Sequence, residues 1–220
     1  MLTNKEIEKK GMERGNNMYK NFLKRIFDFI FAAIVLVIFS PFFILICIII
    51  KLDSKGSIFF KQLRIGKNKK EFMILKFRSM TVDAPSEEPT CMLKNPDKYI
   101  TNFGKFLRVT SLDELPQLIN VIAGHMSIVG PRPVVCKEHD LIVKRNESGV
   151  YDVRPGLTGW AQINGRDEVL IDMKVKYDKE YVDRISLLFD LKCILKTFPL
   201  VLKAEGVSEN GRIEEIEKKV

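Results

Sequence analysis

The sequence predicts a mostly helical α+β fold that is attached to a membrane. Three observations predict it: a long uncharged apolar segment near the N-terminus, one pair of short strand-like runs, and several later segments with helical periodicity. The chain has 220 residues, which suits one domain and is short for two. Hydrophobic residues make up 46% of it, so an intrinsically disordered protein is excluded.

The charge balance points to an anionic partner. The 36 lysines and arginines outnumber the 28 acidic residues, which leaves a net charge of +8. This charge suits nucleic acid, lipid headgroups or a phosphorylated substrate, and composition does not choose among them. The four cysteines form no CxxC pair and only two histidines are present, so the sequence predicts no zinc site and a reducing, cytosol-facing environment.

The first predicted element is an apolar segment over 29–50. It contains no charged residue, and its length matches the roughly 20 residues that a bilayer core requires. It begins too late, and is too long, to be the apolar core of a signal peptide. The segment is therefore predicted to lie in a membrane.

Ser40 and Pro41 interrupt this segment at its middle. Pro41 removes a backbone donor, so the helix is expected to break there, and Ser40 can bond a carbonyl that Pro41 frees. Basic residues flank both ends of the segment, and basic flanks favour the cytoplasmic side. Two arrangements follow: a re-entrant helical hairpin over 24–52 with both ends cytoplasmic, or a single span kinked at Pro41. The residues alone favour neither.

The elements that follow are short. Residues 57–80 have the pattern of two strands around a turn at 66–68, which predicts a small β-hairpin. Residues 82–98 hold three prolines and several acids, which predicts a loop, and a short helix is expected over 101–108. Beyond them, helices are predicted over 111–123, 134–147 and 168–183, with loops rich in Gly and Pro over 127–133 and 154–160.

The last apolar segment, 184–203, carries Lys192, Lys196 and Lys203 along an otherwise apolar surface. It suits either an amphipathic helix in a membrane interface, with its lysines reaching for phosphates, or a helix packed in a soluble core. The expected organisation is a polar arm over 1–18, one domain over 19–203 and a charged tail over 204–220.

The strongest candidate for chemistry is the stretch 110–116, Thr-Ser-Leu-Asp-Glu-Leu-Pro. The sequence contains no G-x-G-x-x-G, G-x-x-x-x-G-K-[ST] or G-x-S-x-G motif. The structural interpretation of the stretch is a helix start, because Ser111 and Glu114 have the spacing of a capping box. The functional interpretation uses the same geometry: a helix N-terminus attracts phosphate and keeps Asp113 ionised, and an ionised carboxylate can attack phosphorus.

Two adjacent acids beside a phosphate also imply a divalent cation, usually Mg²⁺, that offsets the negative charge. Arginines in or beside loops bounded by Gly or Pro add to the functional interpretation, because Arg makes bidentate contacts to phosphate. These arginines are Arg108, Arg132, Arg154 and Arg166.

At these residues the sequence resembles a known family. The matching stretches are 24–28, the Ser40-Pro41 break, 76–80, 108–118, 129–133, 154–166 and 190–192. Together, over about 20 to about 208, they resemble the bacterial sugar transferases called small monotopic phosphoglycosyl transferases, or polyprenyl-phosphate glycosyl-1-phosphate transferases. Each motif alone is weak, and the set is specific.

The resemblance implies that a sugar-1-phosphate moves from a UDP-sugar to a polyprenyl phosphate such as undecaprenyl phosphate, which releases UMP. This is the first membrane step of a bacterial glycan: capsule, exopolysaccharide, O-antigen or glycoprotein oligosaccharide. It also implies a monotopic protein of the bacterial cytoplasmic membrane, with a re-entrant helix and a catalytic face toward the cytoplasm. Expected partners are the two substrates and anionic membrane lipids, with a homo-oligomer left open and no nucleic acid.

The acidic dyad of the family maps onto Asp113 and Glu114. Asp113 is the expected nucleophile, which forms a covalent phosphosugar intermediate, and the expected Mg²⁺ ligand, while Glu114 assists. Five further residues match family positions or stretches, and substrate or phosphate contacts are expected from them: Lys76, Arg108, Arg132, Arg166 and Asp190.

Two other functions are kept as alternatives. The basic stretch 61–78, which contains phenylalanines, suits a membrane-anchored nucleic-acid-binding protein. The apolar segments also suit a non-catalytic scaffold on anionic lipid. Both alternatives predict that function survives the Asp113→Ala substitution. A polytopic phosphoglycosyl transferase is excluded, because only one strong apolar segment is present.

Overall fold

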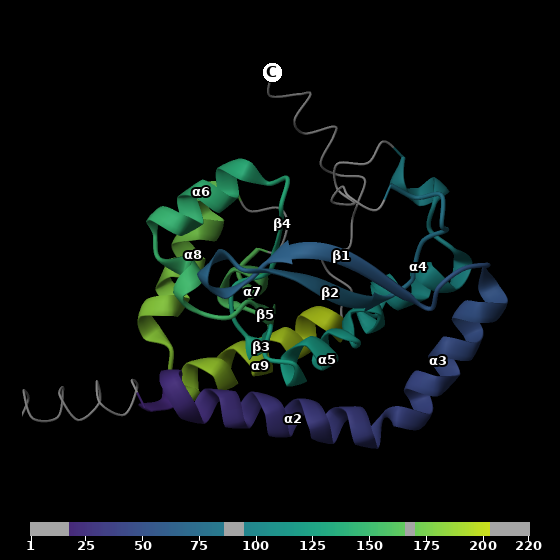
Figure 1. The fold of residues 1–220 in the computed structure, drawn as a ribbon. Helices are drawn as coiled ribbons and strands as arrows, with labels where there is room; N and C mark the ends of the chain where they lie inside the picture. Colours follow the sequence, from purple (N-terminus) through teal and green to yellow (C-terminus); the bar gives the residue numbers. More distant parts are fainter. Residues whose placement is uncertain (1–17, 86–94, 166–169, 203–220) are drawn as a thin grey trace, which may run out of the picture.

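The computed structural model describes residues 18–85, 95–165 and 170–202 (Figure 1). The predicted arm, apart from residue 18, and the predicted tail lie outside the described residues, as does the centre of the 82–98 loop. Within the described part the α+β, mostly helical fold class is confirmed, because helices surround two small sheets.

The N-terminal part is a bent pair of helices. After a π-helical turn (Tyr19–Leu23), α2 (Lys24–Ile38) and α3 (Ser40–Asp53) are separated by one residue, and their axes turn by 65°. The proline explains the bend, and the Ser40 hydroxyl donates to the Val37 carbonyl at 2.9 Å, as the sequence predicts. Among the described residues no single helix is long and apolar enough to cross a membrane, although the bent pair together meets that test.

A β-hairpin follows, as predicted. β1 (Phe59–Ile65) pairs antiparallel with β2 (Glu71–Phe77) around a 3-10 turn (Lys67–Lys69). A two-residue strand, β4 (Val134–Val135), pairs with the opposite edge of β1, so the sheet has the order β2-β1-β4. β2 is therefore an edge strand.

The helix predicted over 111–123 is wrong in its first half. A 3-10 turn (Leu112–Glu114) comes first, and α5 (Gln117–Ile122) begins only after the proline at 116. Ser111 has a left-handed backbone with φ +56° and makes no side-chain capping bond, so the predicted capping box is also wrong. α5 is fixed by Asn120, whose amide accepts from the Leu75 N–H at 2.9 Å and donates to the Met73 carbonyl at 2.8 Å. This side chain covers the exposed edge of β2 in place of another strand.

The two loops rich in Gly and Pro contain strands that the sequence analysis missed. β3 (Ser127–Val129) pairs in parallel with β5 (Gly156–Thr158). Directly after β3, the backbone at Gly130 lies very close to the backbone at Gly156. A Cβ on Gly156 would lie 2.1 Å from the backbone nitrogen of Gly130, so this crossing requires glycine. The helix predicted over 134–147 is shorter, because its first residues form β4 and α6 covers His139–Glu147.

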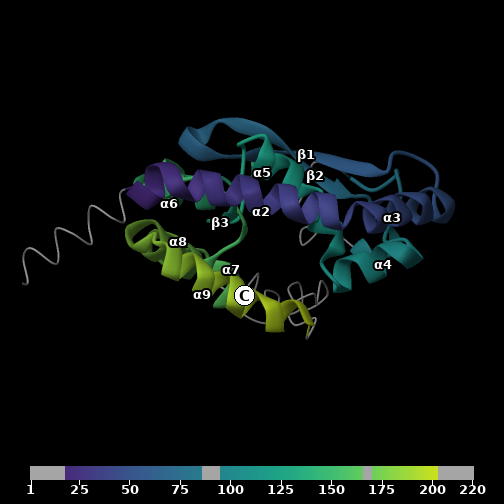
Figure 2. The same ribbon diagram turned by 90° about the horizontal axis from the view of Figure 1, so that it is seen from below.

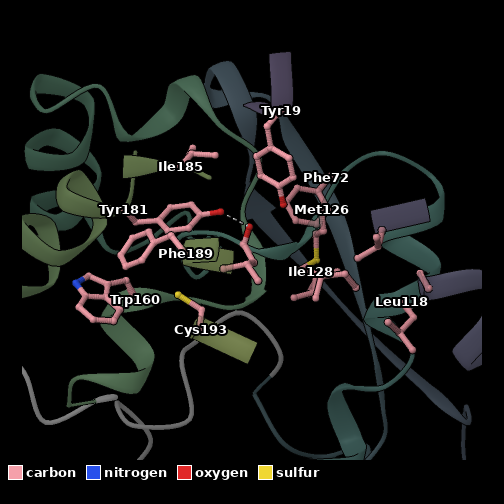
Figure 3. Close-up of a cluster of buried hydrophobic side chains, with 14 residues drawn as sticks. Tyr19, Phe72, Leu118, Met126, Ile128, Trp160, Tyr181, Ile185, Phe189 and Cys193 are labelled. Carbon is pink, nitrogen blue, oxygen red and sulfur yellow. Dashed lines mark hydrogen bonds between the residues drawn. The ribbon is translucent and has the colours of Figure 1, made fainter. Parts of the chain in front are cut away.

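The remaining helices are α4 (Asn102–Val109), α7 (Trp160–Ile163), α8 (Ile171–Arg184) and α9 (Leu187–Leu202), and α4, α8 and α9 agree with prediction. The main core contains aromatic and aliphatic side chains from most of these elements (Figure 3). At its centre the Tyr181 hydroxyl lies within hydrogen-bond distance of two acceptors that share its one proton, the Val129 carbonyl at 2.9 Å and the Asp190 carboxylate at 2.8 Å.

α9 packs one face into the core and leaves apolar side chains exposed on another. Phe189 and Cys193 are buried in the core, whereas Leu188, Leu195 and Phe198 are exposed. Figure 2 shows α9 on the same side of the molecule as α2 and α3. α2, α3 and the residue between them expose many large apolar side chains as well: Phe27, Phe29, Ile30, Phe31, Ile34, Val37, Ile38, Phe39, Phe42, Ile44, Leu45, Ile48 and Leu52.

Candidate active site

Four of the predicted site residues meet in one cluster, here called the dyad cluster: Lys76, Asp113, Glu114 and Arg132. Lys76 Nζ lies 2.7 Å from Glu114 Oε1 and 3.8 Å from Asp113 Oδ2, so one lysine contacts both acids. Arg132 Nη2 lies 3.1 Å from the same Glu114 oxygen. The four residues come from β2, from the 3-10 turn Leu112–Glu114 and from the loop between β3 and β4, which are far apart in the sequence.

Apolar neighbours in the sequence explain why these polar side chains meet. Phe77, next to Lys76, is buried in a second core cluster with Ile46 and Ile50 of α3. Leu112 and Leu115, which flank the two acids, pack against the same cluster. Packing of these flanking side chains anchors the strand end and the turn, and the polar residues between them are brought together.

Arg78, the residue after β2, anchors this strand to the bent pair of helices, α2 and α3. Its buried guanidinium donates to the carbonyls of Ile50, Ser54 and Lys55 at 2.6 to 3.1 Å. These carbonyls belong to the end of α3 and the residues after it, and the Ile50 carbonyl also accepts from the Ser54 N–H at 3.3 Å. The dyad cluster is therefore built on a segment that is tied directly to α3.

The two acids have different electrostatic surroundings. Burial raises the pKa of Asp113, the Lys76 ammonium opposes this, and the Glu114 carboxylate adds to it. Burial would also raise the pKa of Glu114, but Lys76 and Arg132 outweigh it and hold that pKa well below the usual range. The charge of Glu114 is thus strongly stabilised, whereas the cations around Asp113 only partly offset the effect of burial on its pKa.

The other predicted residues lie in different places. Arg108, at the end of α4, lowers the pKa of Asp113 through its charge, which places it beside the cluster. Arg154 instead donates to the Gly124 carbonyl at 2.8 Å, just beyond α5. Asp190 accepts bonds from Tyr19 and Tyr181 and pairs with Lys24, partners that come from the 19–23 turn, α8 and α2 rather than from the dyad cluster. Arg166 lies outside the described residues.

Sequence reasoning missed some neighbours of the dyad cluster. A small cavity beside it is also lined by Arg64, Gln117, Ile74 and Pro133. Burial, together with the charge of Arg132, lowers the pKa of Arg64 to about 10. Arg64 and Gln62 lie two residues apart and therefore on one face of β1. Polar residues at every second position of a half-buried strand were the sequence signal that could have predicted these two neighbours of the cluster.

The cluster suits a magnesium ion in its donor chemistry. Mg²⁺ is usually held by one or two carboxylates together with substrate phosphates and waters, rather than by a complete protein cage. Asp113 and Glu114 are adjacent carboxylates that meet this requirement. The described residues contain no group of three or more acids, histidines and cysteines that could hold a metal ion alone, so any ion here would need oxygens from a substrate.

The Lys and Arg side chains around this carboxylate pair supply the cations that phosphorylated groups bind. Comparisons with known proteins identify the family. The model of the bacterial sugar transferase family matches residues 19–204. The exopolysaccharide production protein ExoY of Rhizobium meliloti is 41% identical over 199 residues, which cover 83% of this chain and 87% of that protein.

Two longer relatives carry more specific names. The UDP-glucose:undecaprenyl-phosphate glucose-1-phosphate transferase of Escherichia coli is 41% identical over 182 residues, which cover 80% of this chain and 39% of that protein. The protein of the same name from Xanthomonas campestris is 39% identical and is matched over 41% of its length. The chain therefore belongs to the bacterial sugar transferase family, and it is a phosphoglycosyl transferase.

Proposed function

We propose that this chain transfers a sugar-1-phosphate from a UDP-sugar to a polyprenyl phosphate, which yields polyprenyl-diphosphate-sugar and UMP. One observation carries the proposal: Lys76 contacts both Asp113 and Glu114, with Arg132 on the second acid. The names of the relatives support the substrate classes and make UDP-glucose and undecaprenyl phosphate the first to test. The names of the ExoY proteins support a role in exopolysaccharide production.

The proposed reaction has two displacements at the sugar-bearing phosphorus. A carboxylate oxygen of Asp113 forms a bond to this phosphorus, and the bond to the bridging oxygen breaks, so UMP leaves with the electron pair. A phosphate oxygen of the polyprenyl phosphate then attacks the same phosphorus. The bond to Asp113 breaks, and the carboxylate is regenerated.

The other residues of the cluster have electrostatic roles in this proposal. Lys76 keeps Asp113 ionised before attack, because its ammonium opposes the effect of burial on the pKa. Arg132 and Arg108 place positive charge where the diphosphate of the donor would lie. Asp113, with Glu114 beside it, would hold Mg²⁺, which when bound supplies charge that stabilises the leaving phosphate.

The shape of α2 and α3 supports a monotopic arrangement in the cytoplasmic membrane. Fifteen residues of α2 extend about 22 Å at about 1.5 Å per residue, which is less than the roughly 30 Å of a bilayer core. The pair turns by 65° and exposes apolar side chains along its length. We propose that it enters and leaves the cytoplasmic leaflet, with α9 lying in the interface and the dyad cluster at headgroup height.

Release of UMP tests the reaction. The purified protein in nanodiscs would be given undecaprenyl phosphate, Mg²⁺ and a panel of UDP-sugars that begins with UDP-glucose. We expect release with one sugar and none from the Asp113→Ala variant, while Asp172→Asn, a change on an exposed part of α8, behaves as wild type. Folded protein that is silent with every sugar, or an Asp113→Ala variant that works normally, would contradict the proposal.

The membrane arrangement is tested by sidedness. Tags at both termini should be digested by protease from the cytoplasmic side of inverted vesicles if the pair is re-entrant. Protection of one tag only would show a kinked single span and would overturn this part of the proposal.

A further inference from the structure

A second arginine, Arg145, holds the backbone of Arg132 in place. The Arg132 side chain is 41% exposed, yet its guanidinium meets Glu114, and the chain that carries it is a loop between two short strands. The backbone carbonyl of Arg132 accepts a hydrogen bond from Arg145 Nη1 at 2.7 Å. The next carbonyl, that of Pro133, accepts one from Arg64 Nη1 at 3.1 Å. Two arginines therefore fix successive peptide groups of this loop.

Arg145 is itself fixed by a buried ion pair. Its Nη2 lies 2.6 Å from Asp178 Oδ2, and the two side chains are only 4% and 1% exposed. Arg145 comes from α6 and Asp178 from α8, so the pair joins two helices as well as the loop. Burial raises the pKa of Asp178, and the Arg145 charge opposes this.

A buried ion pair of this kind is weak evidence for a role in stability. The desolvation of both charges offsets most of their attraction, and well-packed apolar residues of similar size are often as stabilising. The pair with Asp178 orients the Arg145 guanidinium: one of its nitrogens contacts the Asp178 carboxylate, and another N–H then points at the Arg132 carbonyl. The chemistry therefore points to placement of the loop.

We propose that Arg145, oriented by Asp178, is a positioning residue that places the Arg132 guanidinium at the dyad cluster, where it contacts the diphosphate of the donor. The inference rests on the proposed function for the identity of that diphosphate. Neither Arg145 nor Asp178 touches the reacting atoms. Their effect passes through the backbone of Arg132, and a displacement of about 1 Å at such a site is enough to cost about 100-fold.

A double-mutant cycle on ligand binding tests the inference. The probe is UDP, which carries both phosphates, and its affinity for the nanodisc-embedded protein would be measured by calorimetry. Arg145→Lys keeps the charge but cannot bond the carboxylate and the carbonyl with the same planar group, so we expect binding about tenfold weaker. Arg132→Ala should have a similar effect. The double variant should bind UDP no more than about twofold more weakly than Arg132→Ala alone, since Arg145 acts only through Arg132.

Two further variants keep the test decisive if Arg145→Lys misfolds. Replacing the pair by Arg145→Met with Asp178→Leu removes both charges without leaving one unpaired, and the same coupled loss of UDP affinity is expected. The matched control is Lys144→Met, which removes an exposed ion pair with Asp172 between the same two helices. This control should bind UDP as wild type does.

The outcomes separate this inference from the proposed function. Losses that multiply in the double variant, or wild-type affinity in a folded Arg145 variant, would overturn the positioning role. UDP binding with the expected coupling, but without UMP release from any UDP-sugar, would support positioning and count against the proposed transfer alone. Absence of UDP binding by the wild-type protein would overturn the inference together with the assignment of Arg132 to the diphosphate.

Discussion

Replacing Lys76 by methionine tests whether Asp113 is a nucleophile that is kept ionised by one cation. Methionine retains an unbranched apolar stem and removes the charge. Lys76 Nζ lies 3.8 Å from Asp113 Oδ2 and 2.7 Å from Glu114 Oε1. Because burial already raises the pKa of Asp113, loss of the nearest cation should raise it further, and a protonated carboxyl group cannot attack phosphorus.

The size of the effect follows from the distance. Two unit charges about 4 Å apart interact by about 4 kcal/mol at an effective dielectric constant of about 20, and by about 1 kcal/mol in bulk water. The side chains of Lys76 and Asp113 are 17% and 12% exposed, so the interaction lies between these limits. Since about 1.4 kcal/mol corresponds to a factor of ten, Lys76→Met should slow formation of the covalent intermediate by at most about 1000-fold, at pH values below the raised pKa of Asp113.

The assay is the burst of UMP released when enzyme and UDP-sugar are mixed without acceptor, followed from about pH 6 to about pH 9. Asp113 reacts in its ionised form, so the burst rate rises as the pH passes through its pKa. A further raised pKa moves that rise to higher pH, and alkaline solution should partly restore the variant. Lys144→Met is the control, because this lysine is exposed and pairs with Asp172. A Lys76→Met burst with wild-type rate and an unshifted pH profile would show that Lys76 does not keep Asp113 ionised.

Three further predictions follow from the same site and its support. Asp113→Asn should abolish both UMP release and covalent labelling, and Glu114→Gln should impair turnover severely; full activity in Asp113→Asn would overturn the nucleophile assignment. EDTA should stop the reaction and Mg²⁺ should restore it, whereas activity that is unchanged by EDTA would show that the reaction needs no metal ion. Asn120→Leu should lower the free energy of unfolding by about 2 to 4 kcal/mol, because it leaves the Leu75 N–H and the Met73 carbonyl unpaired. Urea unfolding measures this loss, and a value below about 0.5 kcal/mol would show that water replaces the amide.

The elements that sequence analysis predicted correctly are those that depend on local chemistry. The break between α2 and α3 follows from one proline, and the β-hairpin from alternation around a turn. The helices α4, α8 and α9 follow from periodicity over eight or more residues. In each case the residues that decide the structure are neighbours in the chain.

The errors arise where distant residues decide the structure. The helix predicted over 111–123 starts late because Glu114 bonds Lys76 and Arg132 instead of capping its own turn. β3 and β5 were missed because three residues each give no periodicity, and only their mutual close approach explains the glycines. The same holds within the site: Lys76 was found through a family resemblance, and Arg145 was missed because its partners lie on α8 and on a loop.

The structure also distinguishes the two acids without reference to any relative. Glu114 receives the closer contacts, from Lys76 at 2.7 Å and Arg132 at 3.1 Å, so its charge is stabilised and its pKa is held low. Asp113 has a raised pKa and a lysine no nearer than 3.8 Å, so its carboxylate is less stabilised and more basic. A pair whose surroundings push the two pKa values apart divides into a reacting group and a supporting charge. This difference supports the proposal that Asp113 is the nucleophile, and we propose that Glu114 holds Lys76 and Arg132 in position around it.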